Sequence, residues 1–135
     1  MSQPEFEANL ILEATLSPSE DPGKVSQAMK NVLGEVRCDE HIDPGSATLA
    51  TEDPRALIHI RDQLRDRHVR SAAKRQMLLN SSESSTSLML NRQAAAAGVI
   101  ALCGSPEESP LGPIYVRVHS KRIEAVIDWL TAYVG

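Results

Sequence analysis

The sequence contains few aromatic residues and few cysteines, and both scarcities limit its functions. Its only aromatic residues are Phe6, Tyr115, Trp129 and Tyr133. This scarcity disfavours recognition of single-stranded nucleic acid by base stacking. Its two cysteines, at positions 38 and 103, are far apart and form no C-x-x-C motif. We interpret both as structural free thiols, as is usual for a chain in a reducing compartment.

Long apolar runs are also missing. No run reaches the roughly 18 residues that can cross a bilayer, and the N-terminus carries Glu5 and Glu7 in place of a basic start. The sequence therefore predicts no signal peptide and no contact with a membrane, and we expect a cytoplasmic protein. A chain of 135 residues suits one domain, residues 1–135, which can bury roughly two thirds of its unfolded surface without disulfides or metals.

Motifs of familiar catalytic chemistry are absent as well. The chain has no G-x-x-x-x-G-K or G-x-G-x-x-G loop for nucleotides and no G-x-S-x-G turn for a serine nucleophile. Glu107 and Glu108 could do acid–base work, but neighbouring carboxylates in a proline-bounded loop are more often simply exposed. We therefore predict a non-enzymatic protein with no catalytic residue and no cofactor. A small-molecule enzyme that uses Glu108 is a minor alternative.

One segment is dense in potential metal ligands. These residues are Cys38, Asp39, Glu40, His41 and Asp43. Adjacent side chains point in different directions and cannot all reach one ion. The segment therefore predicts a solvated acidic loop, and we expect no metal site.

Positive charge is concentrated in the middle of the chain. The net charge is −4, but residues 55–80 hold seven basic residues against two acidic ones, a local balance of +5 that leaves −9 elsewhere. Within this segment, Arg67, Arg70 and Lys74 are spaced i, i+3, i+7, which predicts one polar side of a helix. Clustered arginines can bind phosphates in a bidentate way. The alternative is a solvated helix face paired with Asp62 and Asp66.

Local patterns predict strands and helices. Residues 8–16 and 114–119 alternate as half-buried strands do, and 47–51 and 86–90 are further strands. Residues 34–38 could form a short edge strand, and the apolar run 99–103 is expected at the centre of the sheet. Together with the helices, these elements predict an α+β fold with a mixed, largely antiparallel sheet of about five strands, covered mainly on one face by three to four helices.

Capping residues predict where the helices begin and end. Asp21-Pro22 and Asp53-Pro54 have the order that starts a helix, Gly34 can end the first one, and Ser120 can cap the last. A change of apolar face near Arg67-His68 predicts a break after the second helix, and residues 94–97 can form a helical turn. The final helix has the apolar stripe Ile123, Val126, Ile127, Leu130 and Val134.

The stretch 88–118 contains the most unusual loop. Asn91, Arg92 and Gln93 follow one strand, and a proline- and glycine-stiffened loop precedes another, so polar groups are held at fixed places. Glu107 and Glu108 make this loop acidic, which favours a structural or docking role over phosphate binding. Arg92 is the better candidate for phosphate contact.

The segments LNRQAAAAGVIAL, residues 90–102, and ESPLGPIYVRV, residues 108–118, resemble the signature of a small, largely uncharacterised archaeal family of predicted RNA-binding proteins. Members of that family carry L-N-K-Q-A-A and E-S-P-L-G-P-I segments at a similar separation. The resemblance covers most of the chain and implies a fold similar to the ribosomal protein that binds 5S RNA. It also implies a link to RNA-processing assemblies. Arg92 stands where the family usually has Lys, which keeps the charge.

These observations lead to two functional hypotheses. The first is a domain that binds structured or ribosomal-type RNA through a basic helical face. Its site residues would be Arg67, Arg70, Lys74, Arg75, Asn91, Arg92 and Gln93. The alternative is a protein-interaction subunit, either a homodimer or part of an RNA-processing assembly, that uses an exposed strand edge and a loop. That loop consists of Ser109, Pro110, Leu111, Gly112 and Pro113.

Overall fold

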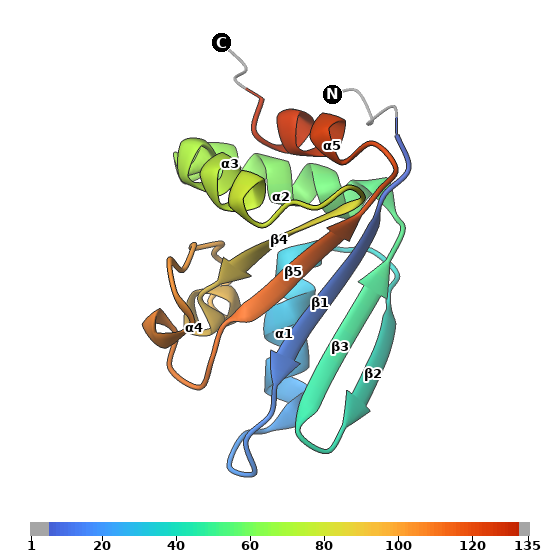
Figure 1. The fold of residues 1–135 in the computed structure, drawn as a ribbon. Helices are drawn as coiled ribbons and strands as arrows, with labels where there is room; N and C mark the ends of the chain where they lie inside the picture. The colour runs from blue at the N-terminus through green and yellow to red at the C-terminus, as the bar shows by residue number, and fades with distance from the viewer. Residues whose placement is uncertain (1–5, 133–135) are drawn as a thin grey trace.

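A five-stranded antiparallel sheet is the framework of the protein (Figure 1). The computed structural model describes residues 6–132. The strands are β1 (Asn9–Thr15), β2 (Asp39–Asp43), β3 (Ser46–Thr51), β4 (Ser85–Leu90) and β5 (Ile114–His119). Their order is β2-β3-β1-β5-β4, and each neighbouring pair is antiparallel. The predicted α+β class and the predicted number of strands are confirmed.

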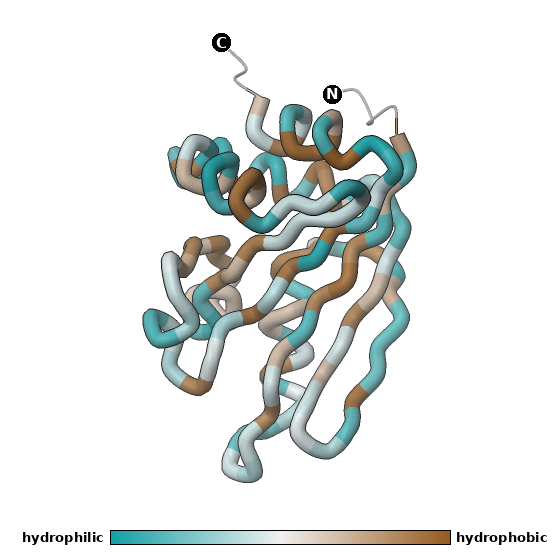
Figure 2. Tube along the Cα trace, in the orientation of Figure 1, coloured by the Kyte–Doolittle hydropathy of each residue, from teal (hydrophilic) through white to brown (hydrophobic). Residues whose placement is uncertain are grey.

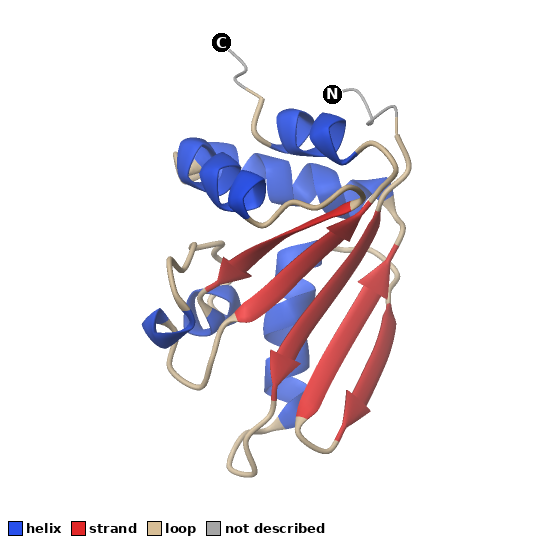
Figure 3. Ribbon diagram, viewed as in Figure 1, coloured by secondary structure: helices blue, strands red, loops and turns tan. Residues whose placement is uncertain are grey.

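Helices gather on one face and at one end of this sheet (Figures 1 and 3). They are α1 (Pro22–Leu33), α2 (Pro54–Asp66), α3 (Arg70–Leu79), α4 (Arg92–Ala96) and α5 (Ile123–Leu130), with a short 3₁₀ turn η1 (Pro106–Glu108). Alternate residues of each central strand, such as Leu10 and Leu12 of β1, are buried against the helices. The alternation of brown and teal along the strands is visible in Figure 2. None of the helices within residues 6–132 is long and apolar enough to span a bilayer.

Short-range signals fixed the helix ends as expected. The side chains of Asp21 and Asp53 accept hydrogen bonds from Gly23 N and Arg55 N, both at 2.9 Å, and a proline opens each helix. Gly34 ends α1 with φ 80, a left-handed conformation that favours glycine. The predicted break between α2 and α3 is confirmed by the φ of 56 at residue 68.

Two strand predictions are wrong. Residues 99–103 are not a central strand, because β1 occupies the centre and only Leu102 forms an isolated bridge, with Leu90. The run instead follows the outer edge of β4, where Cys103 N donates to Met89 O at 2.9 Å. Ile100 and Cys103 are buried there and the other residues of the run are half-buried, and a continuous apolar pattern alone cannot distinguish that position from the centre. The edge strand expected at 34–38 lies instead at 39–43.

The final helix begins later than its expected cap. Ser120 accepts a hydrogen bond from Arg122 N at 3.1 Å, but α5 starts at Ile123 without a side-chain cap. The predicted apolar stripe is buried from Ile123 to Leu130, and Val134 lies outside the described residues.

The stability of α5 on the sheet can be tested at Ile127, which is 1% exposed. Ile127→Ala should lower the free energy of unfolding by about 2–5 kcal/mol, because it removes buried methyl groups and leaves a cavity. Denaturant titration measures the loss. Glu124→Ala on the exposed side of the same helix should change the stability by less than about 0.5 kcal/mol. Equal effects of the two substitutions would contradict the packing of α5.

Candidate functional site

Arg92 forms a buried ion pair at the start of α4. Its Nη1 lies 2.7 Å from Oε2 of Glu20 and 3.0 Å from Oε1, and the two side chains are only 6% and 10% exposed. Its Nε donates to Gly112 O at 3.1 Å, and its Nη2 donates to Thr15 Oγ1 at 3.3 Å. The guanidinium is therefore occupied by partners within the chain. Its expected role as a phosphate ligand does not fit this burial.

Opposing effects act on the carboxyl group of Glu20. Burial raises its pKa, whereas the hydrogen bond from Ser17 N, at 2.9 Å, and the hydrogen bonds and charge of Arg92 lower it. The favourable interactions outweigh the burial, so the pKa of Glu20 lies below its ordinary value. Glu20 is therefore ionised in the fold and joins residues 17–20 to α4.

The interaction loop, residues 109–113, is held by the same network. The buried Ser109 hydroxyl accepts from Arg92 N and donates to Gly112 O, both at 3.0 Å. Leu111 O accepts a bond of 3.3 Å from Thr15 Oγ1. Although these groups are fixed, the Leu111 side chain is 57% exposed, and its backbone is left-handed with φ 67. The network therefore presents one apolar side chain on a rigid loop.

The neighbours of Arg92 have separate roles. The Asn91 side chain accepts from Ala94 N at 2.9 Å, so it caps α4, and Gln93 is exposed. The Glu108 carboxylate accepts a hydrogen bond from Gly104 N, which ties down the loop before η1. Asn91 is thus placed as a structural residue, whereas Gln93 is accessible.

The basic helical face, defined as Arg67, Arg70, Lys74 and Arg75, surrounds the turn between α2 and α3. Arg67 is the C-cap of α2 and does not continue the face of α3, because the chain turns at residue 68. Arg70 Nη1 donates to Ala132 O at 3.1 Å, and Lys74 lies 3.7 Å from Asp128. Within residues 6–132 no ion pair is found for Arg67 or Arg75, and both are exposed.

A hollow of about 330 Å³ opens at this turn. It is lined by His68, Arg70, Ser71, Lys74 and Thr131. Neighbouring basic residues are directed elsewhere: Arg61 lies over the Trp129 ring at 4.7 Å, and Arg65 lies 3.6 Å from Asp62. The hollow therefore gathers Arg70 and Lys74 of α3, whereas the cations of α2 make contacts within the chain.

The structure does not bring the two sets of predicted RNA ligands together. Thr86, at the start of β4, bonds to Met77 O of α3 at 2.5 Å, whereas Arg92 follows the other end of that strand. The six residues of β4 span about 20 Å. The basic helical face and residues 91–93 are therefore separate sites.

The acidic segment forms the exposed edge strand β2. Glu40 accepts from the Ser26 hydroxyl and lies 3.5 Å from Lys30, and His41 lies 3.2 Å from Asp43. In the part of the chain that the structure describes, no three potential ligands come together for a metal ion. The segment is a strand, whereas the sequence predicted a loop, because edge strands tolerate charged side chains on both faces.

Two residues of the ion-pair network carry no signal in the sequence. Glu20 and Thr15 lie 72 and 77 positions before Arg92 in the chain, so no spacing or motif connects them. A buried arginine requires a partner, but a single sequence cannot identify it. Only the fold, which places residues 15–20 beside α4, reveals the pairing.

One antiparallel sheet backed by helices, with a loop held by a buried ion pair, defines a two-layer α+β protein. The chain belongs to the archaeal UPF0201 family. It is 34% identical over 125 residues to a UPF0201 protein of Sulfurisphaera tokodaii, covering 90% of this chain and 86% of the relative. The identity is 33% over 124 residues with a UPF0201 protein of Sulfolobus acidocaldarius, with the same coverage. A comparison with family models gave no match.

Solved structures share the fold. The crystal structure of a UPF0201 protein from Methanococcus jannaschii matches with a TM-score of 0.76 at 22% identity, covering 91% of this chain and 98% of that one. A DUF54 protein from Methanothermobacter thermautotrophicus matches with a TM-score of 0.66 at 16% identity, covering 93% and 96%. The archaeal family indicated by residues 90–102 and 108–118 is thereby confirmed.

Proposed function

We propose that this chain is a protein-interaction subunit that docks through its interaction loop, with Leu111 as the main contact. The observation that carries the proposal is the exposed Leu111 side chain on a left-handed backbone, 57% exposed with φ 67. This conformation costs an L residue about 1–2 kcal/mol, so the surrounding network must hold it. Strain of this kind is concentrated at ligand clamps and other functional sites.

The network around the loop supports this role. Ser109, Gly112 and Arg92 hold the loop through bonds of 3.0–3.1 Å, and the ion pair beneath them is almost fully buried. A loop already fixed in one conformation loses little entropy on binding. An exposed apolar side chain on such a loop can therefore contribute most of its burial energy to a complex.

The partner is a second copy of the chain or another subunit of an assembly, and its surface must include an apolar depression for Leu111. The free edge of β2 is a separate surface. In Figure 1, β2 forms one edge of the sheet, and the interaction loop, which precedes β5, lies toward the opposite edge. At β4 the outer edge is covered, since Met89 N donates to Gln76 Oε1 at 2.6 Å. Strand addition could take place only at β2.

The mass in solution tests which partner is used. Light scattering over a range of concentrations should give twice the 14.7 kDa of the chain if the partner is a second copy. Otherwise, chemical crosslinking in cells of the source organism should join residues near the interaction loop to another protein. A monomer at all concentrations whose loop is not crosslinked in the cell would refute the proposal.

RNA binding is the second candidate, and the hollow at the α2–α3 turn favours it. The hollow gathers the side chains of Arg70 and Lys74, and α3 begins without a side-chain cap. Its first N–H groups and the helix dipole therefore favour a phosphate. A fold like that of the ribosomal protein that binds 5S RNA, which the sequence resemblance implies, supports the same candidate. Contact would be to the backbone of structured RNA, with Gln93 and the buried Arg92 outside the contact set.

A filter-binding titration with structured RNA tests this candidate. The affinity should fall with salt, with a slope of about 0.7–0.9 for each phosphate contacted. Arg70→Gln and Lys74→Gln remove the two cations that line the hollow, and each should reduce the slope by about one. Lys24→Gln on the exposed side of α1 is the matched control and should leave the slope unchanged. Binding that does not depend on salt, or no binding at low salt, would eliminate RNA as the partner.

A further inference from the structure

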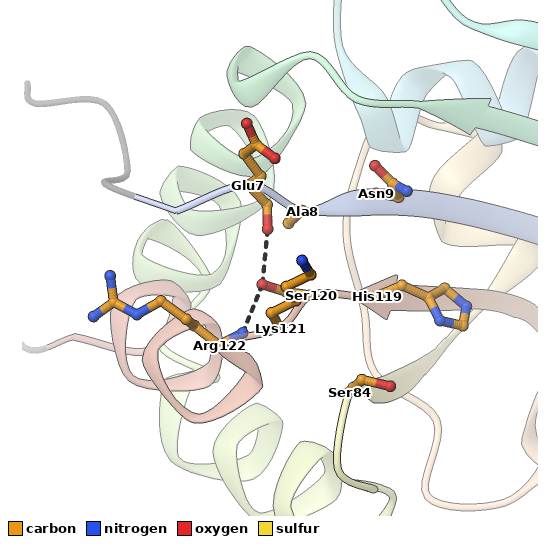
Figure 4. A pocket seen from close by; sticks show the side chains of 8 residues that line it. All are labelled: Glu7, Ala8, Asn9, Ser84, His119, Ser120, Lys121 and Arg122. Atoms are coloured by element: carbon orange, nitrogen blue, oxygen red, sulfur yellow. Dashed lines mark hydrogen bonds between the residues drawn. The ribbon is translucent and has the colours of Figure 1, made fainter.

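A second hollow, of about 460 Å³, lies at one end of the open sheet face (Figure 4). It is formed where three segments meet: the start of β1, the residue before β4 and the turn from β5 to α5. Its volume is within the range of about 300–1,000 Å³ that is usual for small-molecule sites. None of the functional residues predicted from the sequence lines it.

Ser120 fixes the shape of this hollow. Its hydroxyl, on a residue that is 8% exposed, donates to Glu7 O at 2.7 Å and accepts from Arg122 N at 3.1 Å. Its backbone N–H donates to Ser84 O at 2.9 Å. One residue thus joins all three segments, so the backbone around the hollow is held in place before any ligand binds.

Four polar side chains around the hollow have no hydrogen-bond or ion-pair partner among residues 6–132. Asn9 and His119 are directly opposite each other in the β1–β5 register, so their Cβ atoms are about 5 Å apart on the same face. Lys121 and Ser84 complete the group. In residues 6–132, none of these four side chains forms a hydrogen bond or an ion pair with another described residue. Their donors are therefore available to a ligand.

The charge of the hollow favours an anion. In Figure 4 the Glu7 carboxylate and the Arg122 guanidinium point away from the group formed by Asn9, His119 and Lys121. The ammonium group of Lys121 is then the charged group nearest to the ends of β1 and β5, so the local charge is positive. The ammonium and imidazole groups are suitable donors to phosphate oxygens, and the amide and the hydroxyl can bond other polar groups.

This site is separate from the basic helical face. The hollow lies at the start of α5, whereas Thr131, at the other hollow, follows the end of that helix. Between them α5 exposes Glu124 and Asp128, which would repel a polyanion lying along the helix. A small ligand in the hollow does not contact these carboxylates. An RNA strand that covered both hollows would lie against them.

We infer that the hollow binds a small phosphate monoester, with Lys121 and His119 on the phosphate and Asn9 and Ser84 on the remainder of the ligand. This inference is independent of the interaction loop and of RNA binding. It needs only the donors, the rigid frame and the volume described above.

Titration of the full chain with adenosine monophosphate, followed by NMR and calorimetry, tests the inference. We expect saturable binding at one site, with shifts of the amide signals of residues 9, 84, 119 and 121. Lys121→Gln and His119→Gln should each weaken binding about tenfold, the loss expected for a charge-assisted hydrogen bond.

Lys24→Gln, which removes an equal charge from the exposed side of α1, should leave the affinity unchanged. Inorganic phosphate should bind at the same residues but more weakly, because it lacks the groups that Asn9 and Ser84 would contact. No saturable binding to the unaltered chain, or equal weakening by Lys24→Gln and Lys121→Gln, would overturn the inference. Circular dichroism spectra that match those of the unaltered chain ensure that a loss of binding reports on the site.

Discussion

Replacing Arg92 with alanine should lower the free energy of unfolding by about 3–5 kcal/mol, because it leaves a buried charge without its partner. The Glu20 carboxylate is 10% exposed, and the guanidinium 2.7 Å away is its only counterion among the described residues. The substitution also removes the donors to Gly112 O and Thr15 Oγ1. Denaturant titration of the unaltered and altered chains measures the difference.

A double-mutant cycle separates the ion pair from the other contacts of Arg92. Glu20→Ala combined with Arg92→Ala should restore part of the lost stability, because no unpaired charge is then buried. Arg65→Ala is the control, since Arg65 is 40% exposed and lies 3.6 Å from Asp62. An exposed pair of this kind contributes less than about 1 kcal/mol. Equal losses from Arg65→Ala and Arg92→Ala would show that burial of the pair is unimportant.

Acid should reduce the effect of the Arg92 substitution. Burial raises the pKa of Glu20, but the hydrogen bonds from Ser17 N and Arg92 lower it by a larger amount. The pKa therefore lies below the ordinary value of 4.5. A group whose pKa is lowered by folding stabilises the fold fully above its unfolded pKa. That stabilisation is lost as the pH falls from about 4.5 through the pKa of the folded state. The stability difference between the unaltered chain and Arg92→Ala should therefore narrow over that range.

The elements that the sequence predicted correctly are those with a signal in neighbouring residues. Asp21-Pro22 and Asp53-Pro54 cap their helices through bonds that reach only two residues along the chain. The alternation around Leu12 is equally local, because the side chains of a strand alternate between its two faces. Such patterns need no knowledge of the rest of the fold.

The predicted site residues depend on contacts between distant parts of the chain and on where a helix is interrupted. The role of Arg92 depends on Glu20, 72 positions away, and a lone arginine in a sequence suggests an exposed cation. The spacing of Arg67, Arg70 and Lys74 assumed one continuous helix, but the left-handed residue 68 separates Arg67 from the other two. Spacing predicts a shared face only where the helix is unbroken.

The burial of Arg92, which was predicted to bind phosphate, changes the balance between the two functional hypotheses. With Arg92 buried and Asn91 used as a cap, the segment 90–102 supports the shape of the interaction loop and presents no cation. The sequence features that indicate the family thus coincide with the network that holds Leu111. That coincidence is why we place protein interaction before RNA binding.

Replacing Leu111 with glycine should remove partner binding while leaving the fold intact. Glycine adopts φ 67 without strain, which regains about 1–2 kcal/mol, and its greater freedom in the unfolded chain costs about 0.5–1 kcal/mol. The free energy of unfolding should therefore fall by no more than the error of the measurement. The apolar contact is lost at the same time, and binding should weaken at least about tenfold, since burying a leucine side chain contributes about 1.5–3 kcal/mol.

Leu111→Asp should weaken binding further, because it places a charge in the apolar depression of the partner. Leu79→Asp is the matched control, since Leu79 is also an exposed leucine, 80% accessible, but lies on α3 outside the loop. The complex found by light scattering or crosslinking is the readout for binding, and denaturant titration is the readout for stability. If Leu111→Gly and Leu79→Asp leave the complex equally intact, the strained leucine has no part in docking. A large loss of stability in Leu111→Gly would instead show that its side chain supports the fold, because relief of backbone strain can only favour the folded state.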